Sequence, residues 1–343
     1  MAKRKPSRRG GARSSESPRA EVERPSDGEP GRVVAHHGVA VLVRFDAGGE
    51  RQIWLQPEQR AVVGDRVLVS RDRLFVEPPY GVLRRRDPRG RERTIAVNLD
   101  VLGIVIAVEP REPPGYIDRG FVIARSAGIE PIVVLNKVDL EGGPALADRL
   151  REIYAHSADV IVVSALEQRG LDALVARLEG GRLGALVGPS GVGKSSLLNA
   201  LVPDLELVVG ELNRGSGKGR HTTTTATLHE LSSGGFLVDT AGFKDFLAVD
   251  VEVAEAARFF PGFEAAIERG CRFRDCIHRT EPECAVLAAV RAGEIPERRH
   301  LAYGELVDEL AASESTAPAS PRLASRSSSR PSSPSSSSSR EDK

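Results

Sequence analysis

The stretch GPSGVGKS at residues 188–195 decides the fold of the central part of this 343-residue chain. It fits the spacing G-x-x-x-x-G-K-[ST], with an apolar run before it at residues 183–187 and a helical pattern, KSSLLNALV, after it at residues 194–202. Glycines let backbone amides turn toward an anion, and the start of a helix adds its positive dipole end. The stretch therefore predicts a loop that wraps the phosphates of a nucleoside triphosphate, with a chance glycine-rich turn as the alternative.

The base-reading residues are expected upstream of this loop. The apolar run IEPIVVL at residues 129–135 predicts a buried strand and is followed by Asn136, Lys137, Val138 and Asp139, which form the pattern N-K-x-D. The Asp139 carboxylate can accept hydrogen bonds from N1 and the exocyclic amine of guanine, two donors that adenine does not present together, while Lys137 can lie over the ring. A second predicted strand, residues 159–163, ends in the short loop Ser164-Ala165-Leu166, which would back the base. Each pattern is weak alone, but together with the phosphate loop they indicate GTP.

Residues downstream of the loop supply candidates for magnesium and for catalysis. Ser195 and one of the threonines at 222–225, taken as Thr223, are expected to bind Mg²⁺, although four threonines also suit a plain β-strand. After the predicted strand at 235–238, Asp239 is placed to hold the Mg²⁺ shell through water, and the Gly242 amide to sense the γ-phosphate.

The catalytic residues are expected to be Lys194, which reaches the outer phosphates, and His221. Phe243 stands where Ras-like enzymes orient water with a glutamine, and it has no donor or acceptor. We therefore expect His221 to position or activate the water, with a contact to RNA or a partner as the alternative. The full predicted nucleotide site comprises Asn136, Lys137, Val138, Asp139, Ser164, Ala165, Gly188, Pro189, Ser190, Gly191, Val192, Gly193, Lys194, Ser195, Ser196, Asp239 and Gly242.

The order of these motifs is that of a circular permutation, with the base reader before the phosphate loop. Strand pairing in a doubly wound sheet depends on spatial neighbours, so moving the termini to another loop leaves the site intact. The succession NKVD, SAL, GPSGVGKSS, GRHTTT, DTAGF resembles the RsgA (YjeQ) family of circularly permuted bacterial GTPases, over about residues 32–310. One departure is Ala241, where that family often has proline.

The resemblance implies a partner and a role. It implies binding of GTP and GDP and of the small (30S) ribosomal subunit with its 16S rRNA, and a late maturation or checkpoint step after which hydrolysis releases the protein. It also implies slow intrinsic hydrolysis of GTP that the subunit stimulates, in a protein expected to be a cytoplasmic monomer. Two other classes compete: a nucleic-acid-binding module whose nucleotide site is only a slow switch, and a small-molecule kinase, which the N-K-x-D pattern disfavours.

All three cysteines lie within fourteen residues beside a histidine. Cys271, Cys276, His278 and Cys284 form C-x4-C-x-H-x5-C, the complete ligand set of a closed structural Zn²⁺ site. Buried thiols with a stray histidine are the alternative. Few cysteines and no apolar signal segment favour a reducing cytoplasm. Helical patterns at residues 251–260, 285–292 and 296–310 predict a small helical part around the metal, which could bury little core unaided.

The expected organisation is an α/β P-loop GTPase domain, circularly permuted, at residues 91–246, between two smaller domains. Before it, residues 32–90 have short β patterns that predict a small barrel of the RNA-binding OB-fold type, with SH3-like packing as the alternative. After it, residues 247–311 form the helical zinc-binding domain. The tails at 1–31 and 312–343, rich in Ser, Pro and Arg, are expected to be disordered.

The formal net charge of the chain is +0, so the protein as a whole is not attracted electrostatically to nucleic acid. Local clusters of positive charge can still contact it. The arginines at 84, 85, 86, 89, 91 and 93 form a candidate contact for rRNA phosphates, with a solvated linker as the alternative. The basic N-terminal tail is a candidate of the same kind, with a solvated tail of no specific role as the alternative. A composition of 40% hydrophobic and 28% charged residues is ordinary for soluble globular chains, and no run is long enough to span a membrane.

Overall fold

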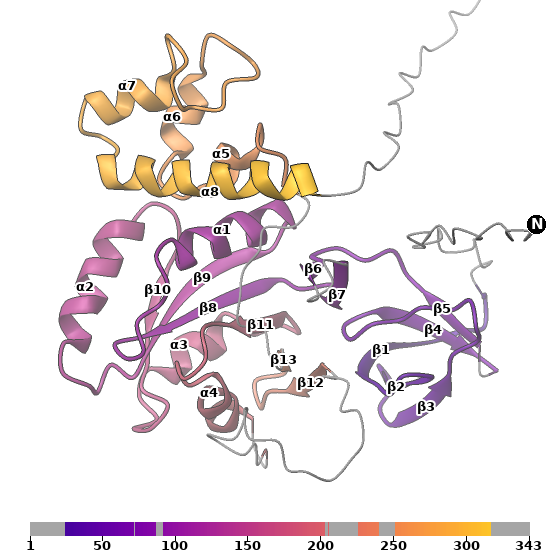
Figure 1. Ribbon diagram of the computed structural model, residues 1–343. Coiled ribbons are helices and arrows are strands. Elements are labelled where there is room, and N and C mark those ends of the chain that lie inside the picture. Colours follow the sequence, from indigo (N-terminus) through magenta and orange to yellow (C-terminus); the bar gives the residue numbers. More distant parts are fainter. Residues whose placement is uncertain are drawn as a thin grey trace, which may run out of the picture.

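The structure is a computed structural model, and it describes residues 25–71, 73–86, 92–202, 205, 226–239 and 251–316. Three parts follow one another along the chain: an N-terminal group of antiparallel strands, a central sheet with helices, and a C-terminal group of helices (Figure 1). No helix in these ranges combines the length and the apolar character needed to cross a membrane.

The N-terminal β-module consists of β1–β5. Its strands pair in the order β3-β2-β1-β4-β5, all antiparallel, so that β1 contacts both β2 and β4. Alternate residues point inward and form a separate apolar core that includes Val33, Val43 and Val67. The strands are β1 (Glu29–His36), β2 (Ala40–Phe45), β3 (Glu50–Trp54), β4 (Arg66–Ser70) and β5 (Arg73–Val76).

An arginine-rich hairpin follows, formed by β6 (Leu83–Arg86) and β7 (Glu92–Ala96). Figure 1 shows it between the N-terminal β-module and the central sheet. Arg85 lies directly opposite Arg93 across the two strands.

The central sheet has the strand order β10-β9-β8-β11-β13-β12. The first five strands are parallel, and β12 runs antiparallel to β13. Strand β11, which leads into the phosphate loop, thus lies in the middle of this sheet, although it is the fourth of the six central strands along the chain. The permuted motif order thus corresponds to a parallel sheet with its phosphate-loop strand at the centre, and the predicted α/β fold of this part is confirmed. The strands are β8 (Val101–Ala107), β9 (Glu130–Asn136), β10 (Val160–Val162), β11 (Leu183–Val187), β12 (Thr227–Glu230) and β13 (Phe236–Asp239).

Helices cover both faces of this sheet. On one face, residues of α1 (Tyr116–Ser126) and α2 (Gly143–Tyr154), such as Phe121 and Leu150, share a core cluster with Ile104 and Val133. On the other face, α3 (Leu171–Ala176) and α4 (Lys194–Leu201) bury their leucines in a second cluster. The strands are buried on both faces, which explains their nearly uninterrupted apolar sequences.

The N-terminal β-module extends the central sheet at its β12 edge. Ala35 of β1 pairs with Thr227 of β12, and the Arg44 guanidinium lies 2.6 Å from the Glu230 carboxylate. The result is one 11-stranded sheet. An exposed edge strand invites pairing with other chains, and here β1 covers it.

The C-terminal helices are α5 (Ala256–Phe259), α6 (Glu264–Arg269), α7 (Ala285–Arg291) and α8 (Glu297–Thr316). The prediction of a helix over residues 251–260 was largely wrong, because only its last residues are helical, and α6 was missed. A turn precedes α5, and Gly262, with φ 85°, separates it from α6. The helical patterns at residues 285–292 and 296–310 correspond to α7 and α8.

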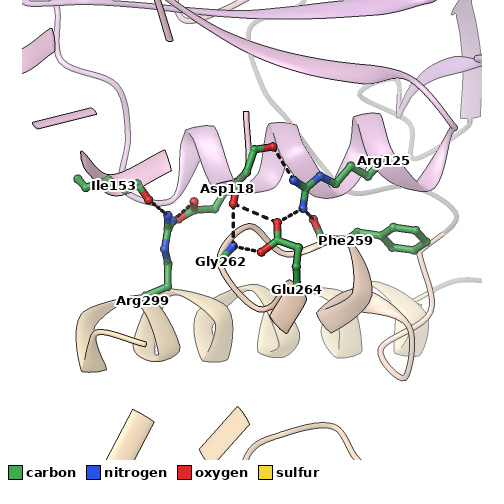
Figure 2. Close-up of polar contacts among 8 residues, drawn as sticks. Asp118, Arg125, Ile153, Phe259, Gly262, Glu264 and Arg299 are labelled. Carbon is green, nitrogen blue, oxygen red and sulfur yellow. Dashed lines mark hydrogen bonds and ion pairs between the residues drawn. The ribbon is translucent and has the colours of Figure 1, made fainter. Parts of the chain in front are cut away.

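The C-terminal helices are held against α1 and α2 by two ion pairs, one buried and one half-buried (Figure 2). Arg299 of α8 lies 2.6 Å from Asp118 of α1 and also donates a hydrogen bond to the Ile153 carbonyl. Arg125 of α1 lies 2.7 Å from Glu264 of α6. The aromatic residues Phe260, Phe263 and Tyr303 lie within the same core cluster as α1, so these helices bury their apolar residues against the central sheet's own helices.

Candidate nucleotide site and metal centre

The phosphate loop connects β11 to the first residue of α4, Lys194. Gly191 and Gly193 have φ values of 87° and 93°, which L-residues with side chains rarely adopt. A Cβ on Gly188 would lie 2.4 Å from the Val105 carbonyl oxygen, so this position also requires glycine. Val192 is fully buried and anchors the loop. These features leave the loop's backbone curved around the start of a helix, the arrangement that binds phosphate.

The Lys194 ammonium lies over the loop. It donates hydrogen bonds to the carbonyl oxygens of Gly188, at 2.6 Å, and Pro189, at 2.9 Å. Ser190, Ser195 and Ser196 are placed in the loop and in the first turn of α4. These two hydrogen bonds keep the ammonium group at the phosphate loop, where it can contact a bound phosphate.

Asn136 ties the base-reading segment to the phosphate loop. Its Nδ2 donates to the Val192 carbonyl at 2.9 Å, and its Oδ1 accepts from the Ala165 amide at 3.1 Å. The side chain is buried. A Cβ on Gly193 would lie 2.3 Å from Asn136 Nδ2. Three segments that are far apart in the sequence therefore meet at one amide group.

Asp139 is held by the second loop. The Ser164 hydroxyl donates to Asp139 Oδ1 at 2.5 Å and accepts a hydrogen bond from the Glu167 amide at 3.1 Å. Leu166, in the same loop, is 86% exposed and forms an apolar edge. Val138 is buried, whereas Lys137 and Asp139 on either side of it are partly exposed.

Sequence reasoning missed the loop after β8. Lys137, with φ 60°, donates from Nζ to the Glu109 carbonyl at 2.9 Å. A Cβ on Gly191 would lie 3.4 Å from the Pro110 ring, so this loop contacts the phosphate loop as well. Its only signal in the sequence was its position at the carboxyl end of a central parallel strand, where ligand sites of such sheets form.

Asp239 ends β13, the strand adjacent to β11. Burial raises the pKa of its carboxyl group, and the positive charges of His229 and Lys194 oppose that rise. Val238, the residue before Asp239, pairs with Ala185 of β11, so Asp239 lies at the end of the sheet from which the phosphate loop begins. Three predicted residues, His221, Thr223 and Gly242, lie outside the described residues.

The three cysteines and His278 form a compact cluster. Their ligand atoms all lie within 4.8 Å of one another. His278 Nδ1 is 3.4 Å from Cys271 Sγ, 3.5 Å from Cys276 Sγ and 3.3 Å from Cys284 Sγ. This geometry can hold a metal ion.

Two backbone amides donate toward sulfurs of the cluster. The amides of Ala285 and Leu287 point at Cys271 Sγ and Cys284 Sγ, at 3.3 and 3.5 Å. Burial raises the pKa of the Cys276 thiol to about 12. Without a cation such a thiol stays protonated at neutral pH, and a bound metal ion would supply the missing charge.

Fold and site together define a circularly permuted P-loop fold in which the N-K-x-D segment lies against the phosphate loop. The sequence model of the RsgA GTPase family matches residues 76–248. The small ribosomal subunit biogenesis GTPase RsgA of Chromohalobacter salexigens is 42% identical over 264 residues, covering 76% of this chain and 74% of the relative. Its namesake from Gemmatimonas aurantiaca is 41% identical over 262 residues, covering 73% and 85%.

Two solved structures are similar to this chain in fold. YjeQ from Thermotoga maritima superposes with a TM-score of 0.68 at 32% identity, covering 82% of this chain and 98% of that one. YloQ, described as a circularly permuted GTPase, gives a TM-score of 0.65 at 26% identity, covering 85% and 98%. The chain belongs to the RsgA GTPase family, and it is a GTP hydrolase.

Proposed function

We propose that this protein hydrolyses GTP on the small ribosomal subunit, as a late maturation or checkpoint factor whose activity the subunit stimulates. The observation that carries the nucleotide part is Asn136, which joins the base-reading segment, the Ser164 loop and the phosphate loop through two hydrogen bonds. The names of the relatives, small ribosomal subunit biogenesis GTPases, support the partner.

The contacts of the described residues support the following roles. Asp139, fixed by Ser164, reads guanine, and Lys137 lies against the base while its amine is held at Glu109. The loop amides and Lys194 neutralise the outer phosphates. His221 positions the attacking water, a role that rests on sequence alone.

Magnesium fits this site. Ser195 stands in the first turn of α4, and Asp239 stands at the end of the neighbouring strand β13. Ser195 and Thr223 would therefore bind the ion, and Asp239 would hold its shell through water. When bound, Mg²⁺ supplies positive charge to the β- and γ-phosphates.

Zinc fits the cysteine cluster. A tetrahedral Zn²⁺ places two sulfurs about 3.8 Å apart and a sulfur and a nitrogen about 3.6 Å apart. The Cys271 and Cys284 sulfurs are 3.9 Å apart, and the distances to His278 Nδ1 are 3.3–3.5 Å. Four protein ligands leave no open position, so the ion is structural.

The remaining assignments concern domains and partners. We assign residues 32–90 to an OB-fold that binds rRNA, 91–246 to the GTPase domain and 247–311 to the zinc-binding domain, with tails at 1–31 and 312–343. The pairing of β1 with both β2 and β4 supports the OB-fold. The protein acts as a monomer in the cytoplasm, where the subunits are assembled.

The test is multiple-turnover phosphate release from GTP with and without purified small subunits. We expect slow release by the protein alone and a rate at least about tenfold higher with subunits, because partners that order a GTPase site accelerate it strongly. Binding of the subunit without acceleration would instead favour a nucleotide-dependent binding switch. Equal competition by ATP would contradict the guanine assignment.

A further inference from the structure

A cleft lies between the helices of the central sheet and the C-terminal helices. Its volume is about 750 Å³, and its walls come from the start of α1, the second half of α2, most of α6 and the start of α8. None of the described residues of the nucleotide and metal sites is among its lining residues. Ligand pockets usually occupy about 300–1,000 Å³ and often lie where two parts of a protein meet, so the cleft has the size and the place of a small-molecule site.

The floor of the cleft is held by contacts between α1, α2 and α8 that Figure 2 shows in part. Asp118 Oδ1 accepts hydrogen bonds from the Arg299 guanidinium at 2.6 Å and from the Tyr154 hydroxyl at 2.9 Å. The Arg299 guanidinium also donates to the Ile153 carbonyl at 3.0 Å. A floor that is already ordered costs little entropy when a ligand binds.

Apolar side chains lie between the charged groups of the cleft. Ile295 and Ala266 are buried, Ile153 is half-buried, and Ala265 and Pro296 are exposed. These residues come from α2, from α6 and from the chain before α8, so they surround the cleft on more than one side. Burial of an aliphatic or aromatic ligand body against them would release water from apolar surface, which favours binding.

The unpaired charges of the cleft favour an anionic ligand. Arg149 of α2 and Arg298 of α8 line it, and neither forms an ion pair or a side-chain hydrogen bond with the described residues. Arg149 also lies near Glu112, outside the lining, and its charge opposes the rise that burial causes in the pKa of Glu112. Of the acidic residues in the lining, Glu152 has no ion pair within the described chain, and each of the others lies within 2.7 Å of an arginine: Asp118 of Arg299, Glu264 of Arg125 and Glu294 of Arg269. Two cations and one carboxylate of the lining therefore remain unpaired.

Arg298 is the residue that a bound anion would stabilise most clearly. It lies in the first turn of α8, where the helix dipole disfavours a cation. Its neighbour Arg299 has Asp118 as a partner, but the described residues provide none for Arg298. An anion in the cleft would provide one, since a guanidinium binds a carboxylate or a phosphate through two parallel hydrogen bonds.

We propose that this cleft binds a small organic anion, with its apolar body on the isoleucines and alanines and its carboxylate or phosphate on Arg298, with Arg149 on the α2 wall. Such a ligand would contact both α2 and α8, so its binding would stabilise the contact between the C-terminal helices and the central part of the chain. The site is separate from the GTP site and does not depend on the proposed function.

The experiment is a titration of the full chain with anilinonaphthalene sulfonate, a fluorescent organic anion, with saturating GDP and Mg²⁺ to fill the nucleotide site. Octanoate, octyl phosphate and octanol then compete with the dye, because they share one alkyl chain and differ in the polar group. Arg298→Gln removes the charge, and Ala265→Trp fills the cleft from an exposed position. The matched controls outside the lining are Arg291→Gln, at an exposed arginine of α7, and Ala311→Trp, at an exposed alanine of α8. Thermal melting shows whether each variant folds.

We expect the wild type to bind the dye in this cleft, and octanoate or octyl phosphate to displace it at concentrations about tenfold lower than octanol needs. Arg298→Gln and Ala265→Trp should each weaken dye binding about tenfold, whereas the two controls should bind it like the wild type. Octanoate should also raise the melting temperature of the wild type and leave that of Arg298→Gln unchanged. The more potent of octanoate and octyl phosphate identifies the anionic group of the ligand as a carboxylate or a phosphate.

Equal dye affinity in the wild type, Arg298→Gln and Ala265→Trp would overturn the proposal, because the dye would then bind elsewhere on the protein. Displacement by octanol at the same concentration as octanoate would overturn the assignment of an anion. Absence of dye binding to the folded wild type would overturn the site itself. Each of these results would leave the proposed function standing, because GTP turnover with and without small subunits is measured independently.

Discussion

At the scale of single residues, Gly193 is where the base reader and the phosphate loop meet. Its φ is 93°, and a Cβ added there would lie 2.3 Å from Asn136 Nδ2, so any side chain is excluded. We expect Gly193→Ala to weaken GTP binding by about tenfold or more, because it combines backbone strain with displacement of Asn136. Titration with a fluorescent GTP analogue measures the effect.

Gly180 is the matched control for this substitution. It has a φ of 73°, but a Cβ there would meet nothing within 4 Å. Gly180→Ala introduces comparable strain without the collision, and nucleotide affinity should stay near that of the wild type. Equal losses of affinity in the two variants would show that strain alone is responsible and that Asn136 is not the junction.

At the scale of elements, the metal cluster stabilises the segment between α6 and α7. We expect Cys276→Ser, or removal of the metal by a chelator, to increase hydrogen exchange at residues 271–284 while α8 stays protected, since Tyr303 packs with Phe260 and Phe263 in the shared core. Arg274→Ala, an exposed position in the same loop, is the control. If chelation unfolded the whole chain, the metal would not act on residues 271–284 alone, and this prediction would be contradicted.

The affinity of the cluster for Zn²⁺ should depend on pH. Burial raises the pKa values of Cys276, to about 12, and of Cys284, so each must release a proton when the metal binds. Lowering the pH supplies the competing proton, and the apparent affinity should therefore fall between about pH 8 and about pH 6. Competition with a chromophoric chelator measures it, and an affinity independent of pH would show that the thiols do not bind the metal as thiolates.

Elements with strong local patterns were predictable from sequence, and contacts between distant segments were not. The apolar run at residues 183–187 and the spacing of the glycines after it indicate a buried strand and a phosphate loop, and the strand is β11. By contrast, α6 is a short helix whose residues are ordered by Arg125 and Ser157, far away in the chain. The pairing of Ala35 with Thr227 and the Glu109 loop likewise depend on tertiary neighbours.

At the scale of the whole molecule, the Asp118–Arg299 pair joins the C-terminal helices to the central part of the chain. Both side chains are nearly buried, and the Tyr154 hydroxyl also donates to Asp118 at 2.9 Å. Removing the cation leaves a buried carboxylate, which costs about 3–5 kcal/mol. We expect Arg299→Ala to lower the free energy of unfolding by about this amount and to increase hydrogen exchange in α1 and in the first turns of α8.

The control is Arg279→Ala. It removes the solvent-exposed ion pair between Arg279, in the loop between α6 and α7, and Asp308 of α8, and it should lower the free energy of unfolding by about 1 kcal/mol or less. The double variant Asp118→Asn/Arg299→Met removes both charges and should recover part of the lost stability. Equal effects of Arg299→Ala and Arg279→Ala in denaturant titrations would show that the buried pair does not hold these parts together.

The most direct test of the shared nucleotide pocket is the nucleotide preference of Asp139→Asn. In the wild type we expect strong preference for GTP over xanthosine triphosphate, because the carboxylate accepts two hydrogen bonds from guanine. In the variant the preference should reverse, since an amide can donate to the extra carbonyl oxygen of xanthine. A variant that retains the wild-type preference would contradict the account, because Asp139 would then not face the base bound at the phosphate loop.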